Sequence, residues 1–211
     1  DGTMLRVAHF AALSNTPMIG INLGNLGFLT DVDKRHGIHA LEKVLAHKYS
    51  TEKRIMLEAE FGADKIIPLC RRIALNEVNI GNHCVLEDFS IYVNEQRVSS
   101  FRADSIIVAT PTGSTAYSLS AGGPILLHGG EMIVITPVCP HSLGARPWVI
   151  GADDSVRIVL KQASQVSIDG YYRGDVPRGQ SVLIKKSEHF ASIIKTTHVN
   201  FYNTLKKKKL M

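Results

Sequence analysis

The chain has 211 residues, enough for one or two domains with a real core. It carries a net charge of +5, but four of its lysines form the run 206–209, and the rest of the chain is close to neutral. No basic patch with interleaved aromatic residues is visible, which argues against nucleic-acid binding. The apolar runs are far shorter than the roughly 20 residues that span a bilayer, and the start does not resemble a signal peptide. We therefore expect a cytoplasmic protein with no membrane contact.

Cys70, Cys84 and Cys139 are odd in number and show no CxxC spacing. This pattern is typical of reduced thiols in a cytosolic protein, not of a disulfide framework or a zinc site.

The opening section has α/β character. Apolar spacing and glycine positions predict, in chain order, a turn, a helix, a short buried strand, a glycine-rich loop and an amphipathic helix. These elements cover Asp1–Thr3, Met4–Leu13, Met18–Leu23, Gly24–Leu29 and His36–His47. An α/β unit normally places a strand before such a turn, so we expect part of this domain to precede Asp1.

From about Tyr49 the pattern changes to short runs, many of them β-branched, separated by turns. The runs are Thr51–Phe61, Arg71–Ile80, Phe89–Val93, Val98–Ala109, Met132–Thr136, Ser155–Leu160, Gln165–Ile168 and Ser181–Ile184. Many short strands with regular turn signals predict a β-sandwich or a similar layered sheet. A helical turn is expected at Ser114–Ser120, and a helix over Val199–Leu210 with lysines at the end that favours cations.

The most informative segment is residues 110–124, which hold six Ser/Thr hydroxyls, three glycines and one tyrosine. It directly follows the apolar run Ser105–Ala109. Hydroxyls and free backbone N–H groups at the end of a strand can hold an anionic, sugar-bearing ligand. The other interpretation is a Ser/Thr-rich turn with Ser114 or Thr115 capping a short helix. The residues alone leave both interpretations open.

Two polar pairs stand near the ends of predicted strands. Asn76-Glu77 interrupts an apolar strand, and an amide beside a carboxylate suits sugar hydroxyls, although a polar edge or a bulge is the simpler interpretation of the pair taken by itself. Arg102 and Asp104 lie two residues apart on one face of a predicted strand. Such a pair is usually a surface salt bridge worth about 0–1 kcal/mol.

Taken in order, these segments closely resemble the NAD kinase family. Asp1-Gly2-Thr3, followed by Leu5-Arg6, is similar to the second half of the family's G-G-D-G motif. Residues 19–30 are similar to G-I-N-x-G-x-L-G-F-L-T, and Asn76-Glu77 is similar to the N-E pair. Residues 110–124 match T-P-T-G-S-T-A-Y-S-L-S-A-G-G-P, and residues 136–143 with Arg146-Pro147 resemble a further signature. The resemblance covers essentially the whole chain.

The resemblance implies transfer of the γ-phosphoryl group of ATP to the 2′-hydroxyl of the adenosine ribose of NAD, giving NADP. Mg²⁺ or another divalent cation would accompany ATP, and no protein metal site is assigned. Asp1 would be the general base for the hydroxyl proton and can help to place Mg²⁺. Gly2 would let the backbone approach the phosphates at the start of a helix, with Arg6 nearby.

The other implied roles concern the dinucleotide. Asn76 and Glu77 would hold ribose and pyrophosphate oxygens, and Arg102 and Asp104 would flank the nicotinamide riboside, with a contribution from a neighbouring subunit left open. The pocket lining would be Thr115, Ala116, Tyr117, Ser118 and Ser120. Many bacterial members carry Gln two residues after a late Asp. Here Ile168-Asp169-Gly170 is followed by Tyr171, so stacking replaces that contact or the contact is lost.

The expected architecture is part of a Rossmann-like α/β domain, residues 1–48 and about 189–211, joined to a β-sandwich NAD-binding domain at about 49–188. The C-terminal helix would return to the α/β domain, and the family implies a homodimer or homotetramer. The alternative is an inactive NAD(P)-binding fragment or divergent homologue, because the two glycines of G-G-D-G before Asp1 are not part of this sequence. A lipid or sugar kinase that shares G-G-D-G is a third hypothesis, against which the long match at 110–124 argues.

The remaining candidates carry weaker signals. His36, His39, His47 and His83 are expected in solvent, while His141 lies in a loop that resembles a family signature. Trp148 is expected to be a packing anchor. A turn-rich hairpin is interpreted as a surface loop, and it contains Arg173, Asp175 and Arg178.

Overall fold

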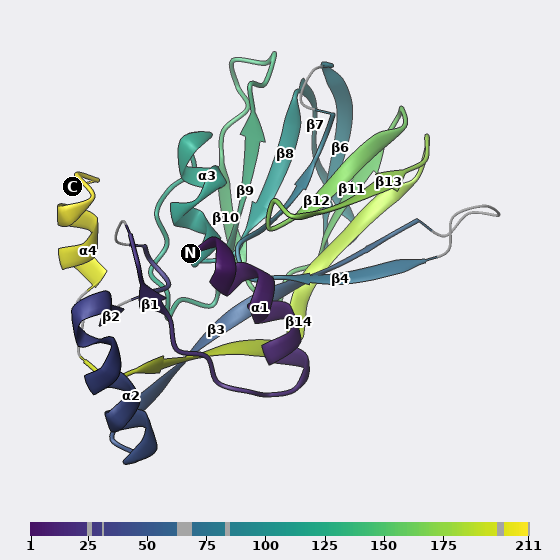
Figure 1. Ribbon diagram of the computed structural model, residues 1–211. Coiled ribbons are helices and arrows are strands. Elements are labelled where there is room, and N and C mark those ends of the chain that lie inside the picture. Colours follow the sequence, from purple (N-terminus) through teal and green to yellow (C-terminus); the bar gives the residue numbers. More distant parts are fainter. Residues whose placement is uncertain (25–26, 31, 63–68, 83–84, 198–200, 211) are drawn as a thin grey trace. The chain divides into compact units, whose positions relative to one another are not determined.

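A computed structural model describes residues 1–24, 27–30, 32–62, 69–82, 85–197 and 201–210 (Figure 1). The chain divides into two compact units. The first unit consists of residues 1–54 and 191–211, and the second of residues 55–190.

The first unit is α/β, as expected. Its helices are α1 (Gly2–Leu13), α2 (Gly37–Leu45) and α4 (Phe201–Lys207), with the short 3₁₀ helix η1 (Lys34–His36) before α2. Two short strands, β1 (Ile21–Asn22) and β2 (Val32–Asp33), pair in parallel. The segment after residue 190 belongs to this unit and carries the C-terminal helix, as the sequence predicts.

The strand predicted over Met18–Leu23 is shorter than expected. Only its last part pairs with β2, while Met18 bridges in parallel to Ile193. The Met18 N–H donates to the Ser192 carbonyl at 2.8 Å, and the Ile194 N–H donates to the Met18 carbonyl at 2.7 Å. The apolar pattern of residues 18–23 predicts a strand, but it does not show that the two ends of this segment pair with different parts of the chain.

The second unit is a sandwich of two six-stranded sheets (Figure 1). In the first sheet the strand order is β10-β9-β8-β5-β12-β13, and in the second it is β4-β3-β14-β11-β6-β7. The strands of the first sheet are β5 (Glu77–Ile80), β8 (Ser105–Ala109), β9 (Met132–Val138), β10 (Trp148–Gly151), β12 (Ser164–Ile168) and β13 (Tyr172–Val176). Those of the second are β3 (Ser50–Phe61), β4 (Cys70–Ala74), β6 (Glu87–Val93), β7 (Gln96–Ala103), β11 (Val156–Leu160) and β14 (Ser181–Lys195).

The core lies between the two sheets and follows from the period of two in a strand. On β11, Val156, Ile158 and Leu160 are fully buried, and the residues between them are partly exposed. They pack in one cluster with inward-facing residues of both sheets. Strand β8 is buried along its whole length, because its other face packs under Leu126 and Val134. Buried apolar surface of this extent supplies most of the stability of such a unit.

Two runs predicted as single strands are each two strands in different sheets. Residues 71–80 divide into β4 and β5, and residues 98–109 divide into β7 and β8. Arg102 lies on β7 and Asp104 between β7 and β8, so the prediction that they share one face of one strand is wrong. Each run has apolar residues on both sides of a short polar step, at Asn76-Glu77 or at Asp104, and such a step looks the same within one strand as between two strands.

Strands β10 and β13 were not predicted, and β14 extends beyond the predicted Ser181–Ile184 to Lys195. The supposed surface loop at residues 173–178 is mostly β13, an edge strand that pairs with β12. Edge strands tolerate charged residues and glycine, so they can lack the alternating apolar pattern by which strands are predicted. Trp148 packs against the core, as predicted.

Among the described residues, the free cysteines are Cys70 and Cys139. Cys84 and His83 lie outside the described residues. No helix in the described part of the chain is long and apolar enough to cross a membrane.

Truncating the core at Ile158 tests the packing between the sheets. Ile158→Ala should lower the free energy of unfolding by about 2–5 kcal/mol, because the fully buried side chain leaves a cavity. Val98→Ala on the exposed edge strand β7 is the control and should cost less than about 1 kcal/mol. Urea unfolding measures both, and equal losses would contradict this description of the core.

Candidate active site

In the first unit, the Asp1 carboxylate holds a loop. Its Oδ2 accepts a hydrogen bond from the Phe28 N–H at 2.8 Å, and its Oδ1 accepts one from the Leu29 N–H at 3.2 Å. The side chain does not cap its own helix α1. The approach requires Gly27, because a Cβ there would lie only 1.8 Å from Asp1 Oδ1. The glycine in G-x-L-G-F-L therefore makes room for the carboxylate.

A cavity of about 330 Å³ opens beside this carboxylate. Its lining includes Asp1, Thr3, Asn22 and Thr30, which bring oxygen atoms to one space. Gly2 and Arg6 are exposed on α1, and a Cβ added at Gly2 would meet nothing within 4 Å. The start of α1 is thus open to a ligand, with backbone N–H groups that favour an anion.

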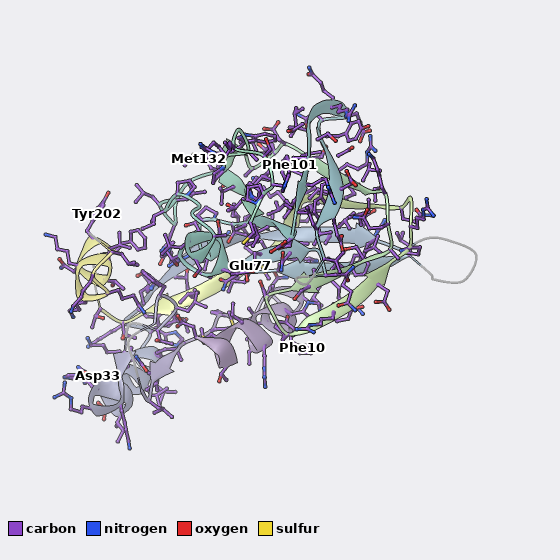
Figure 2. All side chains as sticks on the ribbon, turned by 90° about the horizontal axis from the view of Figure 1, so that it is seen from above. Phe10, Asp33, Glu77, Phe101, Met132 and Tyr202 are labelled. Atoms are coloured by element: carbon purple, nitrogen blue, oxygen red, sulfur yellow. The ribbon has the colours of Figure 1, made fainter. Side chains whose placement is uncertain are left out.

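In the second unit, the predicted Asn76-Glu77 pair lies at the corner where the chain passes from β4 into β5. The Asp169 carboxylate grips this corner through three backbone N–H donors. Asp169 Oδ2 accepts from Leu75 at 2.8 Å, and Oδ1 accepts from Asn76 at 2.7 Å and from Glu77 at 3.0 Å. Figure 2 labels Glu77 among the strands of the second unit.

Asp169 itself carries no motif that predicts this role. Asp169 has a positive φ of 50°, and the next residue, Gly170, has a φ of 75°. Gly adopts this conformation most readily, and Asp is among the other residues that tolerate it, so the Asp-Gly step did signal the turn. The contact with a segment more than 90 residues earlier in the chain left no such signal.

Residues 110–124 are joined to the same corner. The Thr110 hydroxyl donates to the Leu75 carbonyl at 2.6 Å, and the Thr110 N–H donates to the Asn76 carbonyl at 2.9 Å. A Cβ added at Gly113 would lie 2.0 Å from the Asn76 carbonyl oxygen. The hydroxyl-rich segment and the Asn76-Glu77 pair are therefore one connected structure.

Several hydroxyls of this segment hold the segment itself together. It forms the 3₁₀ helix η2 (Gly113–Thr115) and the short helix α3 (Tyr117–Ser120). The Ser114 hydroxyl donates to the Pro111 carbonyl and accepts from the Leu126 N–H, while the Thr115 hydroxyl donates to the Thr112 carbonyl. No side chain caps either helix in the way that the second interpretation expected.

The predicted pocket residues differ in their exposure. Thr115 and Ala116 are partly exposed, Ser120 is exposed, and Tyr117 is 37% exposed. Ser118 is fully buried, and its hydroxyl pairs with that of Thr136 at 2.9 Å, so its observed partner is β9.

The remaining predicted residues are all at least partly exposed. Arg102 is exposed and Asp104 half-buried, and the Asp104 N–H donates to the Val138 carbonyl on β9. Tyr171 is 41% exposed in the turn directly after Asp169. His141 is exposed, and its N–H donates to the Arg102 carbonyl at 2.8 Å.

Burial makes the two carboxyl groups at the corner unusual acids. Burial, and then the negative charge of Asp169, raises the pKa of Glu77 from 4.5 to about 8. Burial also raises the pKa of Asp169, from 3.8 to about 6, although its three backbone N–H donors lower it. At pH 7 the pair therefore holds one negative charge, mostly on Asp169. Glu77 Oε2 is buried without a hydrogen-bond partner among the described residues.

Comparison with known proteins decides the family. The sequence model of the ATP-NAD kinase C-terminal domain matches residues 75–196, and that of the ATP-NAD kinase N-terminal domain matches residues 1–49. The chain belongs to the NAD kinase family. The family resemblance predicted from the sequence motifs is thus confirmed.

Individual relatives agree with this assignment. The NAD kinase of Caldanaerobacter subterraneus subsp. tengcongensis is 41% identical over 213 residues, which cover 99% of this chain and 75% of that protein. The NAD kinase of Pectobacterium atrosepticum is 39% identical over 220 residues, which cover 99% of this chain and 73% of that protein. The chain thus spans about three quarters of the length of these relatives.

Two solved structures of the family resemble the fold. Yeast NADH kinase complexed with NADH gives a TM-score of 0.90 at 26% identity, over 98% of this chain and 62% of that one. An NAD kinase from Archaeoglobus fulgidus in complex with ATP gives a TM-score of 0.83 at 26% identity, over 100% of this chain and 80% of that one. The expected fold class is confirmed.

The raised pKa of Glu77 predicts how stability depends on pH. The folded state resists ionisation of this carboxyl, so its stabilising contribution is complete below about pH 4.5 and is lost as pH rises toward 8. Glu77→Gln cannot ionise and should remove this loss, which is on the order of a few kcal/mol. Urea unfolding of both proteins at pH 5, 6.5 and 8 measures the difference. A difference between the two proteins that does not change with pH would contradict the assignment.

Proposed function

We propose that this protein is an NAD kinase that transfers the γ-phosphoryl group of ATP to the 2′-hydroxyl of the adenosine ribose of NAD, giving NADP. Membership of the family supports the reaction. The Asp1 carboxylate, held by two backbone N–H groups beside an open cavity, is the observation that carries the chemical assignment. Phosphoryl transfer depends mainly on positioning and charge neutralisation, and a rigidly held carboxylate suits both.

Asp1 is proposed as the general base. Each carboxylate oxygen has two lone pairs, and each uses one on a backbone N–H of residues 28 and 29. One lone pair on each oxygen is left to accept a hydroxyl proton. The two hydrogen bonds fix the direction of the side chain, and Gly2 leaves the space beside it open. Fixed direction is what an acid–base group needs to reach the proton that it takes.

We propose that a divalent cation, Mg²⁺ in the first place, enters with ATP. No cluster of three or more metal-binding side chains occurs among the described residues. Mg²⁺ is commonly held by substrate phosphates and one or two carboxylates, and Asp1 with the oxygens of Thr3, Asn22 and Thr30 around the cavity fits that pattern. When bound, the cation neutralises the charge that develops on the phosphate oxygens.

The corner of the second unit is proposed to bind the dinucleotide. Glu77 is protonated at neutral pH, so it does not repel the pyrophosphate, and its unpartnered Oε2 offers a hydrogen bond to a ribose or pyrophosphate oxygen. Asn76 adds an amide, and Tyr117 adds a partly exposed ring. Arg102 and Asp104 are proposed for the nicotinamide riboside end, with Tyr171 stacking beside Asp169.

The homodimer or homotetramer that the resemblance implies is also part of this proposal, as is a cytoplasmic location. Strand β7 supports the proposal of a homo-oligomer, because it lies at an edge of its sheet with most of its side chains exposed. Edge strands are the parts of a sheet that most readily pair with a second copy.

Replacing Asp1 tests the chemistry. In the full-length protein, Asp1→Asn should lower kcat for NADP formation from NAD and ATP by about 10²–10⁴-fold, because the amide cannot accept the proton. The dissociation constant for NAD should stay within about twofold of wild type if binding belongs to the second unit. A coupled assay for NADP and calorimetric NAD titration measure the two quantities.

The matched control is Glu42→Gln, an exposed carboxylate on α2 that should leave kcat unchanged. Full activity of Asp1→Asn would contradict the base assignment. A wild-type protein that binds NAD but forms no NADP would instead support the alternative of a non-catalytic homologue.

Removing the ring of Tyr117 tests the pocket. Tyr117→Ala should weaken NAD binding by about tenfold, since stacking of an aromatic ring on a base is worth about 1–3 kcal/mol. Tyr202→Ala, on the exposed face of α4, should leave the affinity unchanged. An unaltered dissociation constant for Tyr117→Ala would exclude this residue from the pocket.

A further inference from the structure

Three consecutive residues at the corner, 75–77, have all six of their backbone polar groups bonded to two other residues. The Asp169 carboxylate accepts hydrogen bonds from the three N–H groups, and the Asp169 N–H donates to the Glu77 carbonyl at 3.0 Å. Thr110 donates its hydroxyl to the Leu75 carbonyl and its N–H to the Asn76 carbonyl. We call Asp169 and Thr110 the corner clamp.

The corner needs such partners because it lies between two sheets. Here the chain leaves β4 in one sheet and enters β5 in the other, so regular ladder bonds do not continue through it. Leu75 is fully buried, and Asn76 and Glu77 are each 8% exposed. A buried backbone group without a partner costs about 1–3 kcal/mol, so these groups must be satisfied within the protein.

The clamp also fixes where the two side chains at the corner stand. With all six groups bonded, the backbone of Asn76 and Glu77 has little freedom to rotate. Gly113 packs against Asn76 so closely that a Cβ would overlap it, which limits movement on that side. Glu77 Oε2 is buried and has no hydrogen-bond partner in the described part of the chain, which the fold by itself does not require. By fixing the backbone of Glu77, the clamp also limits where this oxygen can lie.

We propose that Asp169 and Thr110 are positioning residues that hold Asn76 and Glu77 in the orientation that binds the ribose of the dinucleotide. Neither residue contacts the ligand in this account. They act through the backbone of residues 75–77. The inference rests on the proposed function, and it adds that dinucleotide affinity depends on two buried residues behind the pocket.

Asp169→Asn tests the first half of the clamp. The amide places an N–H group against a backbone N–H, so at least one of the three bonds is lost. We expect KM and the dissociation constant for NAD to rise about tenfold or more, while KM for ATP stays within about twofold. Amide hydrogen exchange of residues 75–77 should become faster. Steady-state kinetics, NAD titration and exchange mass spectrometry measure these effects.

Glu87→Gln is the matched control for a buried carboxylate. Glu87 is 1% exposed, lies on β6 and accepts hydrogen bonds from Asn82 and Gln162. This variant should lower the thermal stability but leave the affinity for NAD unchanged. A merely structural role of Asp169 would make the two variants behave alike.

Thr110→Val and Thr110→Ser test the second residue of the corner clamp. They also keep the inference testable if Asp169→Asn does not fold. Valine keeps the shape but loses the hydroxyl bonded to Leu75, so we expect KM for NAD to rise several-fold. Serine keeps the hydroxyl and should restore KM to within about twofold of wild type. Equal effects of valine and serine would overturn the inference.

The outcomes separate this inference from the proposed function. If wild type forms NADP and Asp169→Asn keeps the wild-type affinity for NAD, the clamp is wrong and the function stands. If wild type binds NAD without forming NADP, the function fails, and the dissociation constants of the variants still decide on the clamp. If wild type does not bind NAD, both are overturned.

Discussion

The hydrogen bonds between the Asp169 carboxylate and three successive backbone N–H groups are the interaction on which the second unit's site depends. They hold the chain where it changes sheet, and they bring a residue from late in the chain to the Asn76-Glu77 pair. Burial, and after it the negative charge of Asp169, raises the pKa of Glu77 so that this carboxyl is protonated at neutral pH. The Asp169 carboxylate therefore contributes both to the architecture and to the acid–base state of the corner.

The first unit repeats the arrangement with Asp1. This carboxylate also accepts hydrogen bonds from the backbone N–H groups of adjacent residues, 28 and 29, and its approach requires a glycine at position 27. The two carboxylates differ in exposure. Asp1 is exposed beside a cavity, whereas Asp169 is 8% exposed and bonded to the backbone. In the proposed function, similar bonding serves a reactive group in one unit and a supporting group in the other.

Much of this could be predicted from the sequence, because local signals carry it. The helices α1 and α2, the β-rich second half and the motifs around Asp1, Asn76 and Tyr117 all follow from short-range patterns or family resemblance. The changes of sheet at the two corners could not be predicted, since a short polar step between apolar residues looks the same within one strand as between two strands. The bonds of Asp169 to the corner could not be predicted because its partners lie more than 90 positions away, and the partner of the Ser118 hydroxyl, Thr136, lies on strand β9 and not on the same helix.

The most direct test of the central claim is a crystal structure of the protein with NAD bound. The account predicts that a ribose or pyrophosphate oxygen lies about 2.5–3.2 Å from Glu77 Oε2, while Asp169 keeps its three bonds to residues 75–77. NAD bound elsewhere, with Glu77 Oε2 still buried and without a partner, would contradict it.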